Sequence, residues 1–186
     1  MEKLFFYDLE TTGLDSKLNG IHQISAIIVI DGEVKEKFNF KVRPSDNAII
    51  DEYALKVAGV TTEQVLSYPD MGLVYKQLIG VLSKYVDKFN KKDKFHLVGY
   101  NICGFDNDFF RNFFSDNGDK YFGSWFFSGG IDCMVLANHK LRKERSLIPD
   151  FKQSTVAKYM GIEVDESRLH DAEYDIDICM KIYEKI

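Results

Sequence analysis

Two acidic residues, Asp8 and Glu10, end a run of apolar and aromatic residues near the start of the chain. Residues 4–9 have the β-forming, almost unbroken apolar character of a strand that is buried on both faces. If the strand continues through the two acids, both carboxylates leave the same face, because side chains alternate along a strand. Two carboxylates beside an apolar strand repel each other and lose water, so they need a cation or must become neutral. Oxygen ligands without sulfur suit a hard divalent ion, and the pair therefore predicts a site for Mg²⁺ or Mn²⁺.

The residues that follow the acids are suited to hold a ligand. Thr11 and Thr12 supply hydroxyl groups that can form hydrogen bonds, and Gly13 lets the backbone turn or approach a ligand closely. Residues 8–13, DLETTG, resemble the first motif of the DEDD 3′-to-5′ exonucleases. This superfamily includes the proofreading epsilon subunit, ribonuclease T and oligoribonuclease. A lone D-x-E is common, but this longer motif on the first buried strand is specific. The resemblance implies further acidic residues downstream.

A second stretch resembles the second motif of this superfamily. The superfamily has an asparagine followed closely by an aromatic residue and an acid, and this chain has Asn101, Phe105 and Asp106. Asp108 is the alternative candidate for the acid of this motif; otherwise it is a solvent-exposed residue on a helix. The place directly after the aromatic residue favours Asp106. Many relatives have histidine where this chain has Tyr100.

A third stretch, residues 170–175, resembles the motif H-x-A-x-x-D. It supplies His170 and Asp175, and Asp171 stands where the tyrosine subclass has tyrosine. The resemblance therefore implies the histidine subclass. His22, His96 and His139 lack such a context and are expected to be surface or structural residues.

The resemblance also implies a role for each of these residues. Two divalent metal ions, Mg²⁺ or Mn²⁺, would be held by four acids, and His170 would accept the proton of the attacking water. The four acids are Asp8, Glu10, Asp106 and Asp175. The residues implied to contact the terminal nucleotide are Leu9, Thr11, Thr12, Gly13, Leu14, Gly59, Asn101 and Phe105. Ala58 stands before Gly59 where many relatives have histidine, which puts the contribution of this turn in question.

Length and composition are those of a globular protein. The chain has 186 residues, with 45% hydrophobic and 28% charged residues, and one domain over 1–186 is expected. No apolar run approaches the roughly 20 residues of a membrane helix, and Asp8 interrupts any signal-peptide region. Cys103, Cys133 and Cys179 are widely spaced in apolar contexts, which suggests reduced thiols. A cytoplasmic protein without a membrane association is expected.

Basic residues are clustered although the net charge is −5. Each cluster is either a phosphate-contacting surface or an ordinary solvated face. One cluster comprises Lys84, Lys88, Lys91, Lys92 and Lys94, and the other comprises Lys140, Arg142, Lys143 and Arg145.

The pattern along the chain predicts the elements that position these residues. Strands are expected at 4–9, 21–30, 34–42, 95–100 and 131–135, with a hairpin turn at Asp31-Gly32. Helices are expected within 51–66 with a break at Gly59, at 71–89, from Phe105 onward, at 135–141, at 151–160 and at the end of the chain. This order predicts an α/β fold, with a central mixed five-stranded sheet and helices on both faces. The resemblance narrows it to the ribonuclease H-like fold.

Function is expected to follow the resemblance. A metal-dependent 3′-to-5′ exonuclease would release nucleoside 5′-monophosphates from single-stranded 3′ ends, with DNA slightly favoured over RNA. An RNA-trimming enzyme of the same superfamily and a non-catalytic nucleic-acid-binding or polymerase-associated module remain as alternatives, and a DNA polymerase is a candidate partner. Trp125, Phe126 and Phe127 would either stack on bases or cover the edge of the core.

Overall fold

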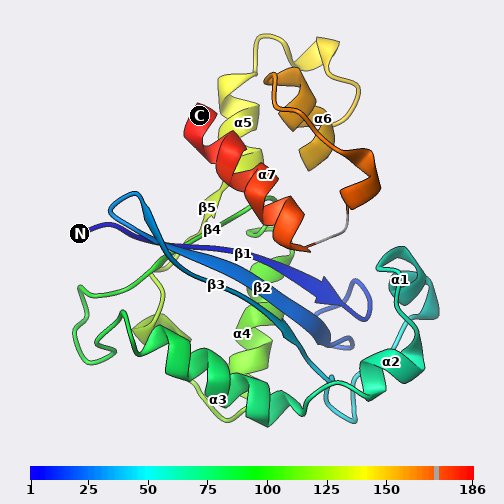
Figure 1. The fold of residues 1–186 in the computed structure, drawn as a ribbon, viewed down its shortest axis with the longest axis vertical. Coiled ribbons are helices and arrows are strands. Elements are labelled where there is room, and N and C mark those ends of the chain that lie inside the picture. The colour runs from blue at the N-terminus through cyan, green and yellow to red at the C-terminus, as the bar shows by residue number, and fades with distance from the viewer. Residues whose placement is uncertain (170–171) are drawn as a thin grey trace.

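A mixed sheet of five strands forms the centre of the molecule (Figure 1). The computed structural model describes residues 1–169 and 172–186. The strands lie in the order β3-β2-β1-β4-β5; β1 pairs antiparallel with β2 and parallel with β4. Their bounds are β1 (Lys3–Thr11), β2 (Ile21–Ile30), β3 (Glu33–Lys41), β4 (His96–Gly99) and β5 (Ile131–Asp132). The predicted α/β class and the five-stranded mixed sheet are confirmed.

Helices cover both faces of the sheet, as predicted (Figure 1). One face is covered by α3 (Met71–Leu82) and α4 (Asp106–Asp116), and the other by α5 (Cys133–Lys140), α6 (Gln153–Tyr159) and α7 (Ala172–Lys185). Two short helices, α1 (Glu52–Val57) and α2 (Thr62–Leu66), lie beyond the end of β1 (Figure 1). Within the described residues, 3₁₀ turns are found at η1 (Phe122–Ser124), η2 (Arg145–Leu147) and η3 (Glu166–Arg168). Among the described residues, no helix has the length and apolar character needed to span a membrane.

Alternation along β1 fills both layers of the core. Phe5, Tyr7 and Leu9 pack toward α3 and α4, whereas Leu4 and Phe6 pack toward α5, α6 and α7. Aromatic side chains of α4 meet those of β1, and Trp125 and Phe126 are buried in the same cluster. These two rings therefore cover the core and do not stack on a ligand. Because packing fixes β1 from both sides, the acids at its end are held on a rigid strand.

The turns at the ends of the strands follow the sequence closely. Asp31 and Gly32 both have positive φ, at 48° and 82°, which suits the tight hairpin between β2 and β3. Thr61 caps α2 in a capping box with Gln64, and Gly161 ends α6 with a φ of 73°. Local turn chemistry therefore sets these three boundaries.

Two boundaries differ from the sequence prediction by more than two residues. α3 ends at Leu82 and not near residue 89, because the buried Lys3 ammonium binds Tyr85 O and the Asp93 carboxylate and so draws the chain into a loop. β5 has two residues, and α5 begins directly after it, because the Asp132 side chain accepts from Met134 N at 3.0 Å and caps the helix.

Candidate active site

The acid pair leaves β1 on the face that α7 covers. β1 runs through both acids, with Asp8 opposite Ser25 and Glu10 opposite Gln23 on β2. Both carboxylates are half-buried, while the intervening Leu9 side chain points into the core on the other face. The predicted common face of the two acids is confirmed by this register.

Asp106 reaches this place from the first residue of α4. Its side chain is 5% exposed, and Oδ1 accepts a hydrogen bond from Leu9 N at 3.2 Å, beyond the last β1 residue that pairs with β4. Asp108, two residues along the same helix, is exposed to solvent. Asp106, and not its rival, therefore lies beside β1.

Asp175 comes from the first turns of α7. Gln153 Nε2 on α6 donates to its main-chain oxygen at 2.5 Å, which ties the start of α7 to α6. Asp8 and Asp175 both line a cavity of about 680 Å³, together with Asn101 and Lys152. The cavity lies past the carboxyl end of β4, where parallel strands of open sheets offer binding sites.

Electrostatic repulsion links all four acids. Burial raises the pKa of Asp8 well above its usual range, and the charges of the other three acids raise it further. Burial and the charge of Asp175 raise the pKa of Glu10 to about 7, although the nearby Lys41 lowers it. Burial also raises the pKa of Asp106 to about 7, against the hydrogen bond from Leu9 N. The arrangement therefore disfavours four negative charges and favours a bound cation.

The donor set fits a hard divalent ion. Four carboxylates from β1, α4 and α7 supply oxygen ligands only, which suits Mg²⁺ or Mn²⁺. Within 1–169 and 172–186, no three carboxylate, histidine or cysteine side chains are placed so that they could together hold a metal ion. The fit therefore rests on the chemistry and mutual repulsion of Asp8, Glu10, Asp106 and Asp175.

A lysine and a glutamine beside the acids were missed by the sequence reasoning. Lys41 on β3 pairs with Gln23 on β2, and the Lys41 ammonium donates to Gln23 Oε1. The amide of Gln23 donates to Ser25 Oγ at 3.3 Å. The alternating pattern of β3 placed Lys41 on the polar face, but the strand pairing that brings it toward Glu10 is a long-range contact that no local pattern reports.

Asp132 is a second residue that the sequence reasoning missed. Its carboxylate is 5% exposed and accepts hydrogen bonds from Asn101 N at 3.0 Å and Cys103 N at 2.9 Å, in addition to capping α5. It thereby fixes the loop between β4 and α4, in which Asn101 has a φ of 62°. A helix-capping aspartate can be read from sequence, but its bonds to residues about thirty positions away cannot.

The predicted substrate residues after β1 form a tightly bonded loop. Thr12 is fully buried; its hydroxyl donates to Ile49 O at 2.8 Å and accepts from Gly20 N at 3.0 Å. Thr11 Oγ1 donates to Gly13 O at 2.7 Å. A methyl group added at Gly13 would lie 2.4 Å from Cγ of Asn19, so this loop packs too closely for a side chain. Leu14 is 84% exposed at the loop surface.

The other predicted substrate residues lie around the same end of the sheet, whereas the predicted base, His170, is not among the described residues. Asn101 lines the cavity, and Phe105 precedes α4 with its ring 5.0 Å from that of Phe109. Gly59 forms the turn between α1 and α2 with a φ of 69°. His170 lies outside the described residues, so the third motif is seen only through Ala172 and Asp175.

The family model described as RNase T exonuclease matches residues 5–183. The chain belongs to this exonuclease family. The match spans all three motifs, from β1 to α7. Residues 8–13 therefore lie inside the region that the exonuclease family model matches.

Relatives of known sequence and structure agree with this assignment. The PolC-type DNA polymerase III of Mycoplasmopsis pulmonis (strain UAB CTIP) is 25% identical over 177 residues, which cover 95% of this chain and 11% of that protein. E. coli Exonuclease I in complex with a dT13 oligonucleotide superposes with a TM-score of 0.78 and 22% identity, over 99% of this chain and 40% of that one. A zinc-bound form of the E. coli ExoI–ssDNA complex superposes with a TM-score of 0.77 and 22% identity, over 99% of this chain and 40% of that one. These structures confirm the ribonuclease H-like fold, and this exonuclease-family chain spans only part of each relative's length.

Proposed function

We propose that this chain hydrolyses phosphodiester bonds at the 3′ end of single-stranded nucleic acid and releases nucleoside 5′-monophosphates. The observation that carries the proposal is the convergence of four acids from β1, α4 and α7 at one end of the sheet, in a chain of the exonuclease family. A cation bound among these acids would reduce their mutual repulsion, so the arrangement favours cation binding. We assign the histidine subclass from His170 in the third motif.

The chain's own residues would act as ligands, a base and a substrate clamp. Two divalent ions, Mg²⁺ or Mn²⁺, would supply an activated water and compensation for charge on the phosphoryl and leaving oxygens when bound. Asp8, Glu10 and Asp175 would hold one ion and Asp8 and Asp106 the other. His170, with an ordinary pKa of about 6.5, would accept the proton of the attacking water near neutral pH.

Substrate binding would use the loop after β1 and the loop before α4. The bonded loop holds the Gly13 backbone and the exposed Leu14 side chain at the end of the sheet, where the sugar and base of the terminal nucleotide can meet them. Thr12, whose hydroxyl is buried and bonded, would serve by fixing this loop. Asn101 and Phe105 would line the opposite side, with Leu9 acting through its backbone and Gly59 shaping the outer turn.

DNA is the substrate that the comparisons favour. The curated relative is a DNA polymerase, and the E. coli structures contain ssDNA or DNA oligonucleotides. The PolC-type relative also makes a DNA polymerase the protein partner to test by co-purification. The 2′-hydroxyl decides between RNA and DNA at close range, so RNA trimming is the competing activity to measure in the same assay.

The test is degradation of matched 5′-labelled single-stranded DNA and RNA in Mn²⁺. We expect a ladder that shortens from the 3′ end in the wild type and is lost in Asp8→Ala and His170→Ala. A faster ladder on RNA would reverse the preference for DNA. If neither substrate is degraded while Mn²⁺ binds, the chain is a non-catalytic binding module and the proposed hydrolysis is wrong.

A further inference from the structure

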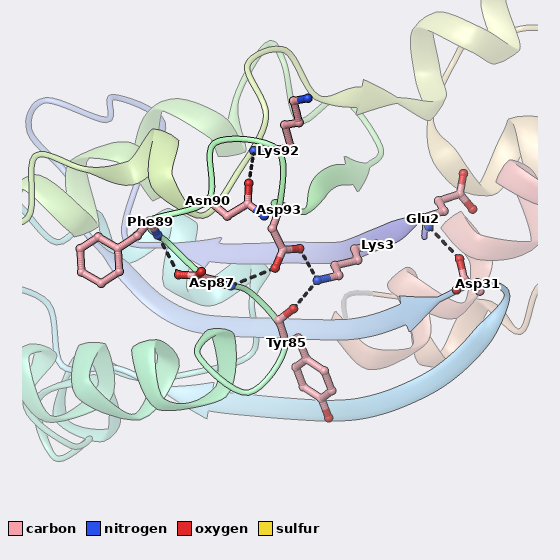
Figure 2. Close-up of polar contacts among 9 residues, drawn as sticks. All are labelled: Glu2, Lys3, Asp31, Tyr85, Asp87, Phe89, Asn90, Lys92 and Asp93. Atoms are coloured by element: carbon pink, nitrogen blue, oxygen red, sulfur yellow. Dashed lines mark hydrogen bonds and ion pairs between the residues drawn. The ribbon is translucent and has the colours of Figure 1, made fainter.

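The loop between α3 and β4, residues 83–95, carries a group of lysines and aromatic rings far from the four acids. It approaches Lys3, the first residue of β1, whereas Glu10 lies seven residues further along that strand (Figure 2). At about 3.3 Å per residue, the two positions are about 23 Å apart. The loop is therefore a separate surface at the opposite end of the sheet from the proposed active site.

A buried ammonium holds this loop in shape. Lys3, which is 8% exposed, donates to Tyr85 O and to the Asp93 carboxylate, and Asp93 Oδ2 accepts from Asp87 N at 3.0 Å (Figure 2). Asp87 Oδ1 in turn accepts from Phe89 N at 3.0 Å. The charge of Asp93 is paired with Lys3 in this network, which leaves only Asp87 to offset part of the positive charge of the lysines on the outside of the loop.

Four lysines on this surface lack an acidic partner. Lys84 pairs with Glu36, but across the described ranges none of the other lysines of the cluster forms an ion pair. They are Lys88, Lys91, Lys92 and Lys94. A local concentration of positive charge on a chain of net charge −5 attracts a polyanion.

Aromatic rings lie among these lysines. Phe89 is 85% exposed and extends outward from the loop, with Lys88 Nζ 5.4 Å from its centroid (Figure 2). The half-exposed Phe127 stacks on His96 with centroids 4.6 Å apart, and Lys94 Nζ lies 5.9 Å from the Phe127 ring. A surface hollow of about 620 Å³ adjoins these groups, and Lys92, Lys94, His96 and Phe127 line it. Exposed rings among lysines suit unpaired bases and their phosphates, because bases in a duplex are already paired and stacked.

We propose that this surface, made of Lys88, Phe89, Lys91, Lys92, Lys94, His96 and Phe127, is a second binding site for single-stranded nucleic acid. Its lysines contact backbone phosphates, and Phe89 and the His96–Phe127 pair stack on bases. The site does not depend on hydrolysis at the four acids. In a strand that is being degraded, it holds a segment on the 5′ side of the reacting end.

The first test measures binding in EDTA, where hydrolysis plays no part. A fluorescein-labelled oligothymidylate of about 25 nucleotides is titrated with wild type and with the triple variant Lys88→Ala/Lys91→Ala/Lys92→Ala, and anisotropy gives the affinity at several salt concentrations. We expect weaker binding and a slope of log K against log salt that is smaller by about two, since each single-strand phosphate contact contributes about 0.7. The control, Lys76→Ala/Lys120→Ala/Lys181→Ala, removes the same charge from exposed positions outside both basic clusters and keeps the wild-type slope. Equal losses in the two variants would mean that overall charge alone acts, and would overturn the site.

The second test addresses stacking and the kind of partner. Phe89→Ala is expected to weaken binding roughly fivefold or more, and Phe89→Tyr to retain it, because a base stacked on an aromatic ring contributes about 1–3 kcal/mol. Tyr159→Ala, at an exposed ring on α6, is the matched control. A duplex that competes as well as the single strand, or polyglutamate that competes as well as unlabelled oligothymidylate, would overturn the assignment to single-stranded nucleic acid. If the wild type degrades nucleic acid but the loop variants bind it as tightly as wild type, this site is rejected and the proposed hydrolysis stands. If the loop variants lose binding but the wild type degrades neither DNA nor RNA, the proposed hydrolysis is rejected and this site stands.

Discussion

Asp106 and Asp108 show how two similar residues on one helix receive different environments. Asp106 is buried against β1 and bonded to Leu9 N, whereas Asp108 faces solvent. We predict that Asp106→Asn lowers kcat by at least about 100-fold, since even the outer partners of a metal site contribute about 10- to 100-fold. Asp108→Asn should stay within about twofold of wild type. Steady-state degradation of a labelled oligonucleotide checks the pair, and equal losses would contradict the assignment of Asp106.

His22 is a residue whose burial predicts a dependence of stability on pH. It is fully buried, and in the described part of the chain neither imidazole nitrogen has a hydrogen-bond partner. Burial, with a smaller effect of Lys41, lowers the pKa of His22 to about 4. Between about pH 6.5 and pH 4 the unfolded chain therefore binds a proton that the folded chain does not, so this residue reduces stability as the pH falls.

We predict that His22→Leu removes this loss. In urea unfolding with EDTA, the gain in stability of the variant over wild type should grow from about pH 7 to about pH 5, by an amount on the order of 1–2 kcal/mol. The comparison isolates His22 because the raised pKa values of Glu10 and Asp106 act in the opposite direction in both proteins. His139→Leu, at an exposed histidine, serves as the control. A gain that does not change with pH would show that His22 is protonated equally in both states.

At the scale of elements, the loop after β1 is a rigid unit. Asn19 spans it, accepting from Asp15 N at 2.9 Å and donating to Ile49 O at 2.8 Å. We predict that Gly13→Ala displaces Asn19, lowers the free energy of unfolding by about 1–3 kcal/mol and raises KM, because the added methyl group has no space. Gly80→Ala within α3, where a methyl group meets nothing within 4 Å, should instead be neutral or stabilising by up to about 1 kcal/mol. Urea unfolding and KM measurement check both variants, and an unchanged KM in Gly13→Ala would remove the loop from substrate binding.

The junction between β5 and α5 positions the loop that carries Asn101. The Asp132 carboxylate accepts from four backbone N–H groups through its two oxygens, whereas an asparagine side chain has only one acceptor oxygen. We predict that Asp132→Asn costs about 1–3 kcal/mol of stability and lowers kcat, because α4 and its Asp106 lose their fixed approach to β1. Asp70→Asn changes an exposed cap of α3 and should cost no more than about 1 kcal/mol without affecting kcat. A stable Asp132→Asn protein with wild-type kcat would contradict this role.

The sequence could predict the elements whose signals are local. The buried strand at residues 4–9, the Asp31-Gly32 hairpin, the capping threonine and the aromatic face of α4 all follow from neighbours within a few positions. The apolar spacing continues through Tyr85 and Phe89 and so predicts a helix as far as residue 89, whereas the contact that ends α3 comes from Lys3, more than eighty residues away. The acids could be predicted from motifs, but Asp132 and Lys41 act through bonds and pairings between distant segments. Such partners become visible only once the strand order is known.

Across the whole molecule, charge is separated along the direction of β1. Its carboxyl end gathers four acids that repel each other, and the loop beside its amino end carries lysines without acidic partners in the described segments. The lysines beside the amino end of β1 therefore attract a polyanion. The four acids at the carboxyl end repel a polyanion unless bound cations offset their charge. The net charge of −5 conceals this arrangement, which is why composition alone is a poor guide to a nucleic-acid partner here.

The same separation predicts how the folded state responds to a divalent ion. An ion that binds only the folded chain stabilises it by about 2.7 kcal/mol at one hundred times its Kd, which for a chain of this size corresponds to roughly 5–10 °C in Tm. Asp8→Asn should have a higher Tm than wild type in EDTA, because it relieves repulsion from the other acids, and should lose most of the rise in Mn²⁺. Asp108→Asn, at an exposed acid, should keep the full rise. Thermal scans of the three proteins, with and without Mn²⁺, check both signs at once. If Mn²⁺ raises the Tm of Asp8→Asn as much as that of wild type, the ion binds elsewhere. If the Tm of Asp8→Asn in EDTA is lower than that of wild type, the Asp8 carboxylate stabilises the fold. Repulsion is then not the dominant force among the four acids.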